Sequence, residues 1–385
     1  MMHRPLTLAE AQARLDSLAR PPVAEAVPLA AAVGRVLAAN LHAPGPLPPA
    51  DRALVDGWAL RADDTVGASA YSPLFAQALA VGAAVLPGTA APLSAGDPLP
   101  PGADAVLPLH LVQEAGGMLE LLGPVAPGQH VERAGQDCAA GSVLIPGGRR
   151  LRSMDTALAA AMGLDRLQAT RQPRIRLVPI GRGGGVDLAG RLYPDLITRD
   201  GGVADPVADR AADPRQALTA PGADLILLVG GTSPGAPRGA VLLRELGRLD
   251  WHGLALDPGE AAGAGLVGDT PAILLPGGPA AGWSAYEMLA GRLIRRLAGL
   301  PPGLPHPVMP VPLAVKLVGE VGATRLVPVR LSPQGAVPLP PCPGLAQLVR
   351  ADGFVLVPPH VEGWPAGTEV AVRLFDCFGT RDADH

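Results

Sequence analysis

The sequence predicts an α/β protein with additional β-rich parts, and three observations support this fold class. Short apolar runs at 174–180, 224–229 and 272–275 alternate with helical patterns, as the strands of a parallel α/β sheet do. Glycine and proline, 49 and 45 of the 385 residues, divide the rest of the chain into short elements joined by turns. A chain of this length usually forms more than one domain, and its 48% of hydrophobic residues supply a sizeable core.

The first part of the chain predicts two short helices with a β-rich module between them. Thr7 and Glu10 have the spacing of a capping box, so a helix is expected to begin there. A second helix is expected from 154 to 162, with Ser153 as its N-cap. The stretch between them, 41–150, holds short alternating apolar runs that are typical of strands. We therefore expect the helical segments to pack together and the module to be an insertion.

The α/β part is predicted from 173 to 300. Two of its strands run directly into glycine-rich turns, GGTSPG at 230–235 and PGGP at 276–279, and a helix is expected over 283–298. Ligands of parallel sheets bind at the carboxyl ends of the strands, where these turns lie. The sequence therefore predicts a ligand site formed by the two turns.

A proline-rich linker at 300–312 leads to short strands that predict a small β domain. The alternative fold is a two-domain α/β protein without an insertion. The predicted domains are 1–40 with 140–172 as a discontinuous helical part, 41–139 as the inserted module, 173–300 as the α/β domain and 301–385 as the β domain.

Composition excludes several classes of partner. A net charge of -4 gives no general attraction to nucleic acid or to acidic membranes, and 3% aromatic residues argue against single-strand binding. Cys138, Cys342 and Cys377 form neither a zinc spacing nor a disulfide framework, which suits a reducing compartment. No run of 18 apolar residues is present, and the first residues lack the apolar core expected of a signal peptide. We expect a cytoplasmic protein. Lys316 is the only lysine, and all other Lys/Arg positions are arginine.

Clustered carboxylates at 51–64 are the most unusual patch of the first half. Asp51, Asp56, Asp63 and Asp64 can hold a hard cation such as Mg²⁺ or position water, and the alternative is that they cap turns in solvent. Asp137 is a candidate second carboxylate that faces this cluster, with Arg133 as an anion contact. The alternative there is a turn between two strands, with Arg133 and Asp137 as an ordinary ion pair.

The GGTSPG turn predicts an anion site. Gly230 and Gly231 let backbone N–H groups approach an anion, and Thr232 and Ser233 add hydroxyl donors. The alternative is a tight strand-to-helix turn. The turn is not a Walker loop, because no Lys-Ser/Thr follows, and GRGGG at 181–185 lacks the dinucleotide fingerprint. The histidines show no metal-ligand spacing, and GxSxG is absent.

The order of these segments carries a family resemblance. The segments are VPLAAAVGRVLAANLHAPGPLPPADRALVDGWALRADD, GTAAPLSAGDPLPPGADAVLP, PGQHVERAGQDCAAGSVLIPGGRRL, GGTSPG, LALDPGEA, LPGGP and RADGFVLVP. Together they resemble the molybdopterin molybdenumtransferase family, called MoeA in bacteria and the E domain of gephyrin in animals. The resemblance covers essentially the whole chain.

The resemblance implies an elongated, MoeA-like multidomain chain with an inserted β-rich module, a molybdopterin-binding α/β domain and a small β domain. It implies a homodimer in which the inserted module of one subunit faces the α/β domain of the other. The implied reaction inserts molybdate into adenylylated molybdopterin in a Mg²⁺-dependent step and releases AMP. By resemblance, Asp56 and Asp137 are the catalytic and Mg²⁺-binding candidates. The ligand-binding candidates are Gly230, Gly231, Thr232, Ser233, Pro276, Gly277 and Pro279, with Arg182 and Arg238 as possible sources of positive charge.

Departures from the family pattern lie mainly in the α/β part. The two lysines of the family's KPGKP segment fall at Asp257 and Glu260, and a free acid opposite an anion weakens binding. The acidic pair of TGDEL is absent at 180–184. These departures leave an alternative function: a catalytically degenerate paralogue that binds molybdopterin, molybdenum cofactor or a molybdoenzyme as carrier, sensor or chaperone. Further departures are Gly278 for the asparagine of LPGNP, Ala95 for the threonine of TGAPLP, and Ala236 and Arg238 for the aspartates after GGVSVG.

Overall fold

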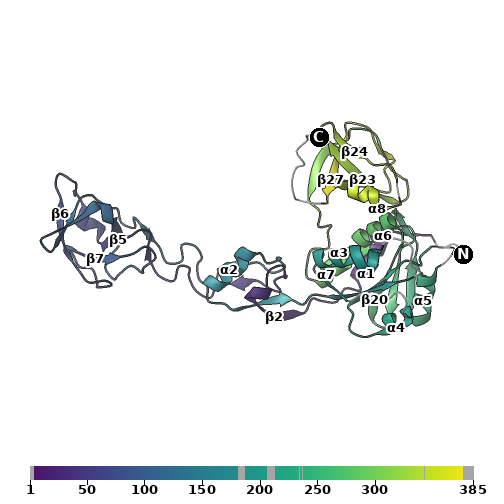
Figure 1. The fold of residues 1–385 in the computed structure, drawn as a ribbon, viewed down its shortest axis with the longest axis horizontal. Helices are drawn as coiled ribbons and strands as arrows, with labels where there is room; N and C mark the ends of the chain where they lie inside the picture. Colours follow the sequence, from purple (N-terminus) through teal and green to yellow (C-terminus); the bar gives the residue numbers. More distant parts are fainter. Residues whose placement is uncertain are drawn as a thin grey trace. The chain divides into compact units, whose positions relative to one another are not determined.

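The computed structural model describes residues 4–180, 187–205, 213–233, 235, 237–341 and 343–375, and it divides into two compact units. The main unit comprises Met1–Ala38, Gly148–Leu151 and Leu167–His385. The inserted unit comprises Ala39–Gly147 and Arg152–Arg166. Figure 1 traces the chain from purple to yellow through both units. No helix within the described ranges is long and apolar enough to cross a bilayer.

The inserted unit is built on a six-stranded sheet of order β8-β5-β7-β6-β10-β9. Its neighbouring strands are antiparallel except β6 and β7, which are parallel. Alternation buries Trp58 and Leu60 of β5 and Leu119 and Leu121 of β10 in one core. The six strands are β5 (Gly57–Leu60), β6 (Leu74–Ala78), β7 (Thr89–Leu93), β8 (Ala105–Pro108), β9 (Val112–Ala115) and β10 (Met118–Leu121).

Short ladders and helical turns complete the inserted unit. Helix α2 (Ser153–Ala161) begins one residue earlier than predicted, since Arg152 is its N-cap and the Asp155 carboxylate accepts the Arg152 N–H at 2.8 Å. Ser153 was therefore wrongly expected to be the cap. The remaining elements are β3 (Leu41–His42) with β12 (Val143–Ile145), β4 (Arg52–Ala53) with β11 (Val131–Glu132), η2 (Ala62–Thr65) and η3 (Leu109–Leu111).

The α/β part of the main unit is a sheet of order β15-β14-β16-β20-β19-β17. Its first four strands are parallel: β14, β16 and β20, as predicted, and the short edge strand β15, which was not predicted. The last two are antiparallel and were not predicted, because short glycine-containing runs such as 263–267 have no clear strand pattern. The strands are β14 (Arg174–Pro179), β15 (Val203–Ala204), β16 (Leu225–Val229), β17 (Arg248–His252), β19 (Gly263–Val267) and β20 (Thr270–Leu275).

Helices cover both faces of this sheet, because alternate residues of its strands point to opposite sides (Figure 1). Leu227 and Ile273 pack with α1, α3 and the α6–α7 region, whereas Leu228 and Leu274 pack with α4 and α5. The predicted capping box begins α1: the Glu10 N–H donates to the Thr7 hydroxyl at 3.2 Å. The helices are α1 (Leu8–Asp16), η4 (Leu188–Leu192), α3 (Tyr193–Arg199), α4 (Pro214–Thr219), α5 (Arg238–Leu246), α6 (Pro279–Ala285), η5 (Tyr286–Ala290) and α7 (Gly291–Leu297).

The C-terminal part forms a second sheet, which includes two strands from earlier in the chain. β1 (Leu6–Thr7) and β18 (Leu254–Asp257) continue this sheet through a parallel pairing of β18 with β23. The α/β and C-terminal parts are therefore joined by backbone hydrogen bonds as well as by the connecting chain. The other elements are β21 (Val308–Pro312), β23 (Thr324–Ser332), β24 (Gly335–Pro338), β25 (Gly353–Val357), β27 (Glu369–Leu374), the pair β22 (Leu317–Val318) and β26 (Gly363–Trp364), and α8 (Leu345–Arg350).

The chain also forms a separate two-stranded sheet and a short helical turn. β2 (Ala24–Pro28) belongs to a two-stranded sheet with β13 (Arg166–Thr170), and η1 (Leu29–Ala31) follows β2 directly.

A buried group of charged side chains lies between the helices of the main unit and the start of its C-terminal part. Arg199 donates to both carboxylate oxygens of Glu287, at 2.8 and 3.0 Å. Arg295 donates to Asp200 at 2.8 Å, and Nε2 of His306 lies 3.2 Å from Glu287. Burial raises the pKa of Glu287, but the His306 hydrogen bond and the Arg199 charge outweigh it and lower that pKa to about 2. Glu287 is fully buried and ionised, so the stability of this buried cluster depends on every partner of its carboxylate.

Candidate functional site

The two glycine-rich turns meet at the carboxyl ends of β14, β16 and β20. The Gly230 N–H donates to the Leu275 carbonyl at 2.8 Å, and the Ile180 N–H donates to the Val229 carbonyl at 2.8 Å. Gly230 has φ +92°, and a Cβ there would lie 2.8 Å from the Ile180 carbonyl oxygen. A Cβ on Gly277 would lie 3.2 Å from the Gly230 Cα. Glycine is therefore required at this contact, which holds the two turns side by side.

The Gly230–Ser233 segment is tied to the structure behind it. The Gly231 carbonyl accepts the Gly239 N–H at 2.8 Å in the first turn of α5. Thr232 is 3% exposed, and its carbonyl oxygen lies 3.1 Å from Nε2 of His252. Ser233 is exposed. Of the two predicted hydroxyl donors, Ser233 is therefore the accessible one, and His252 holds the loop from behind.

The second turn leads directly into α6. Pro279 is the first residue of α6, where its missing N–H costs no helix bond, and Gly278 is the N-cap. The Gly282 N–H donates to the Gly278 carbonyl at 2.7 Å. Arg238 is the exposed first residue of α5, next to the Gly239 that contacts the first turn. Arg182, the other predicted cation, lies outside the described residues.

The predicted carboxylates lie in the inserted unit, where Asp51 rather than Asp137 is the ion-pair partner of Arg133. Arg133 donates to Asp51 at 2.6 Å, and the Ala134 N–H donates to the other Asp51 oxygen at 2.8 Å. These bonds lower the pKa of Asp51, chiefly the backbone bond from Ala134 and then the Arg133 side chain. The alternative that Arg133 and Asp137 form an ordinary ion pair is therefore wrong, because β4 pairs with β11 so that Asp51 comes next to Arg133.

Asp56 and Asp137 lie beyond opposite ends of this ladder. The antiparallel register pairs Ala53 with Val131, so the chain moves toward Asp56 at one end and toward Asp137 at the other. One Asp56 oxygen accepts the Ala95 N–H at 2.8 Å, and the Asp137 N–H donates to the Leu47 carbonyl at 3.0 Å. Across the described residues, no interaction joins the two carboxylates and no group of three or more His, Cys, Asp or Glu could hold a metal ion.

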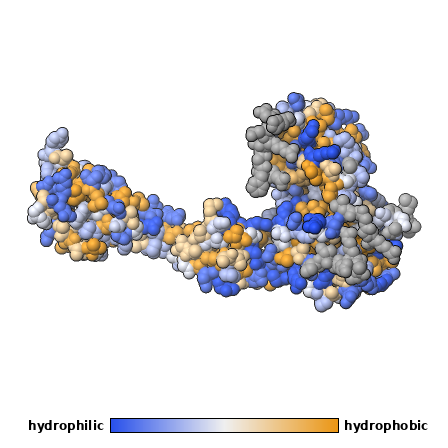
Figure 2. All heavy atoms as spheres, in the orientation of Figure 1, coloured by the Kyte–Doolittle hydropathy of each residue, from blue (hydrophilic) through white to orange (hydrophobic). Residues whose placement is uncertain are grey.

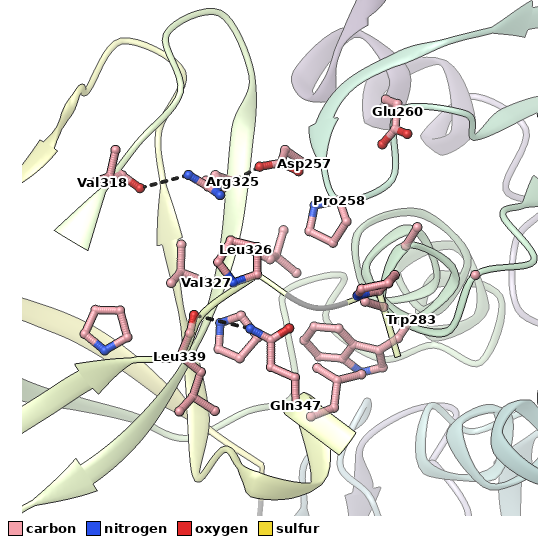
Figure 3. A pocket seen from close by; sticks show the side chains of 18 of the residues that line it. Asp257, Pro258, Glu260, Trp283, Val318, Arg325, Leu326, Val327, Leu339 and Gln347 are labelled. Carbon is pink, nitrogen blue, oxygen red and sulfur yellow. Dashed lines mark hydrogen bonds and ion pairs between the residues drawn. The ribbon is translucent and has the colours of Figure 1, made fainter. Parts of the chain in front are cut away.

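A cavity of about 530 Å³ in the main unit was missed by sequence reasoning. It lies between the 257–260 segment, the start of α6 and the C-terminal sheet, and Figure 3 shows it from close by. Asp257, one of the charge-reversed positions, forms an ion pair with Arg325 of β23, whose Nε lies 2.8 Å from its Oδ2. Lys316 also lines this cavity. It is the only lysine of the chain, and this was the one feature of the sequence that could have drawn attention to the cavity.

The site defines a class of protein: an α/β ligand-binding protein whose two glycine turns meet at the carboxyl ends of parallel strands, with β-rich parts attached. Comparison with known proteins identifies the family. The family model for the MoeA N-terminal region (domain I and II) matches residues 6–163, and that for the MoeA C-terminal region (domain IV) matches 310–375. The chain belongs to the MoeA family.

Individual relatives agree along the whole chain. It is 30% identical to molybdopterin molybdenumtransferase 2 of Mycobacterium tuberculosis, over 90% of this chain and 94% of that protein. It is 27% identical to the molybdopterin molybdenumtransferase of Synechococcus elongatus, over 93% and 96%. The crystal structure of a molybdopterin biosynthesis MoeA protein from Pyrococcus horikoshii matches with a TM-score of 0.81 at 29% identity, covering 97% of this chain and all of that one. The predicted α/β plus β fold class is confirmed.

Proposed function

We propose that this chain acts in molybdenum cofactor biosynthesis as a molybdopterin molybdenumtransferase, which inserts molybdate into adenylylated molybdopterin. Relatives that carry this name cover nearly its full length, which supports the proposal. The single observation that carries it is the contact between the Gly230 and Gly277 turns at the carboxyl ends of β16 and β20. Backbone N–H groups in such turns bind phosphate or an oxyanion without needing a basic side chain.

The proposed roles follow the accessibility of each group. Ser233 and the backbone of Gly231 contact the anionic part of the substrate, whereas Gly230, whose N–H donates to the Leu275 carbonyl, shapes the turn. Arg238, exposed at the start of α5, supplies positive charge near this loop, and Arg182 is proposed for the same purpose from the sequence. Of the other candidates, Gly277 is exposed and Pro279 half-buried, so both are proposed ligand contacts, whereas Thr232 and Pro276 are buried and support the turns from behind.

Asp56 and Asp137 are proposed as the catalytic carboxylates, and their separation limits how they bind Mg²⁺. Both residues are exposed, and one Asp56 oxygen is already used by the Ala95 N–H. A protein cage of both carboxylates does not fit this arrangement within one chain. Mg²⁺ commonly binds one or two carboxylates together with substrate phosphates and water. We therefore propose that Mg²⁺ binds with the substrate and that each carboxylate contacts it or the phosphoanhydride separately.

A homodimer belongs to the same proposal. Leu54 lies close to Asp56 in the chain, and Leu109 is in contact with Asp56. Each of these leucines is 56% exposed. Figure 2 shows further apolar side chains on the visible face of the inserted unit. Apolar surface beside a catalytic carboxylate favours coverage by a second subunit. Light scattering across micromolar concentrations should give twice the mass of the chain, and a monomer would contradict the proposal.

The non-catalytic alternative, a carrier, sensor or chaperone that binds molybdopterin, molybdenum cofactor or a molybdoenzyme, was based on the reversed charges at Asp257 and Glu260 and on the missing TGDEL acids. The Arg325 guanidinium compensates the charge of Asp257, which removes one of these reasons for expecting a repelled anion. A molybdoenzyme partner and a cytoplasmic location stay predictions.

Complementation of a bacterium that lacks its molybdenumtransferase tests the proposal. The wild-type chain should restore molybdoenzyme activity, and Asp56→Ala should abolish that rescue. Asp63→Ala is the matched control, because Asp63 is an exposed carboxylate of the same segment with only a 3.8 Å contact to Arg61. Absence of rescue by folded, expressed wild-type protein would reject the transferase function.

A further inference from the structure

His252, the last residue of β17, lies at the same edge of the α/β sheet as the two glycine turns. β17 is antiparallel to β19, and β19 is antiparallel to β20, so β17 runs in the same direction as β20. The carboxyl end of β17 therefore lies at the edge where β16 and β20 end. A Cβ on Gly263, the partner of His252 across the ladder, would lie 3.2 Å from the His252 Cδ2. Glycine at this position leaves room for the imidazole ring.

The Nε2 atom of His252 contacts two backbone carbonyl groups that belong to different loops. It lies 3.1 Å from the carbonyl oxygen of Thr232 in the first glycine turn and 3.2 Å from that of Ala261 in the turn before β19. A carbonyl oxygen only accepts hydrogen bonds, so Nε2 carries the proton and is shared between the two acceptors. These contacts fix the orientation of the ring and the nitrogen that is protonated.

The contact with Thr232 sets the direction of the next backbone N–H. The peptide bond between Thr232 and Ser233 is trans, so its carbonyl oxygen and its N–H point to opposite sides. Because the carbonyl oxygen points to His252, the Ser233 N–H points away from the ring. Ser233 is exposed, and within the described residues its N–H donates to no carbonyl. The turn therefore presents an unused backbone donor on the side away from His252.

An oriented peptide group of this kind favours the binding of an anion. A donor that already points at the anion needs no rearrangement, and a hydrogen bond to the carbonyl polarises the peptide so that its N–H becomes a stronger donor. The sequence of the site increases the importance of this contribution. Asp257 and Glu260 stand where the family has lysines, so backbone donors supply a larger share of anion binding in this chain.

We propose that His252 is a positioning residue of the anion turn: its Nε2–H holds the Thr232 carbonyl toward β17 and thereby aims the Ser233 N–H at the bound anion. The same Nε2–H holds the carbonyl of Ala261, so the turn and the loop that carries Glu260 depend on one donor. The inference deepens the proposed function and rests on it for the identity of the natural anion.

The backbone amide signal of Ser233 tests the proposal. Selective isotope labelling of the serine nitrogens makes this amide visible by NMR in the full chain, and the signal that is missing from Ser233→Ala assigns it. Inorganic phosphate is the probe, and at constant pH and ionic strength it should shift the Ser233 signal at millimolar concentration. His252→Leu removes the donor and should need about tenfold more phosphate for the same shift, the order of effect of one hydrogen bond.

Further variants separate positioning from a structural role. Glutamine places its side-chain N–H close to the position of the imidazole Nε2–H, so His252→Gln should respond to phosphate as the wild type does. His360→Leu is the matched control, because His360 is an exposed histidine of the same unit, and it should change nothing. Urea unfolding checks that each variant folds. If His252→Leu does not, His252→Asn takes its place with the same expectation, because the shorter amide does not reach the Nε2 position.

The outcomes separate this inference from the proposed function. A Ser233 signal that phosphate does not move in the wild type, or equal phosphate responses of the wild type and the variant without the donor, overturns the inference even where complementation succeeds. Equal weakening in His252→Gln and His252→Leu rejects it as well, since the donated hydrogen bond is then not the cause. Weakening in His252→Leu alone supports it even where complementation fails, because inorganic phosphate is not the substrate of the proposed transferase.

Discussion

Asp257 of β18 lies directly opposite Arg325 of β23 in a parallel pairing, and their side chains form an ion pair of 2.8 Å. The two residues come from the α/β and C-terminal parts of the main unit, so one contact joins the two parts and lines the cavity between them. The family resemblance placed an acid where a lysine is usual. The structure supplies the compensating cation from a different strand.

Reversal of this ion pair tests the contact. Asp257→Arg and Arg325→Asp should each lower the free energy of unfolding, because like charges then face each other across the register. The two side chains are 34% and 23% exposed, so a coupling of about 0.5–1 kcal/mol is expected. Urea unfolding of both single variants and of the double swap measures it. Strictly additive effects would contradict the pairing.

The buried Glu287 is expected to contribute far more to stability than the Asp257–Arg325 ion pair does. Glu287→Gln removes the charge that Arg199 and His306 face, and breaking a buried pair in this way costs about 3–5 kcal/mol. Urea unfolding measures the loss. Glu245→Gln is the control, because Glu245 is 45% exposed in its pair with Arg215 and should change stability by less than about 1 kcal/mol. Similar losses for both variants would show that burial is not the cause.

Lowering the pH should destabilise the wild-type chain more than it destabilises the Glu287→Gln variant. The folded pKa of Glu287 is about 2, below the ordinary value of 4.5, so its contribution is fully present above the ordinary value. It is lost as the pH falls from about 4.5 toward 2, because the unfolded chain binds a proton first. Urea midpoints at several pH values check this. A Glu287→Gln chain that loses stability as steeply in that window would reject the assignment.

Gly230→Ala should distort the anion turn. Its φ of +92° is unfavourable for alanine, and the new Cβ would approach the Ile180 carbonyl oxygen at 2.8 Å. The expected cost is about 1–3 kcal/mol, with a loss of complementation. Gly235→Ala in the same loop is the matched control, because its Cβ would meet nothing within 4 Å. Unchanged stability and rescue in Gly230→Ala would show that glycine is not required at this position.

Local patterns in the sequence predicted what depends on a few neighbouring residues. The capping box of Thr7 and Glu10 forms as expected, because its donors and acceptors are three residues apart. The turns after β16 and β20 meet as expected, because strands that are parallel neighbours end at the same edge of a sheet. The family resemblance added the function, which no local pattern contains.

Only the tertiary structure decided which distant residues became partners. Arg133 pairs with Asp51 rather than Asp137, and Asp257 with Arg325, because the registers of β4 with β11 and of β18 with β23 place them together. Register arises from the packing of whole strand faces against a core, so the composition of one segment cannot reveal it. For the same reason the sequence showed that Lys316 is unique, while the fold decided that it lines a cavity.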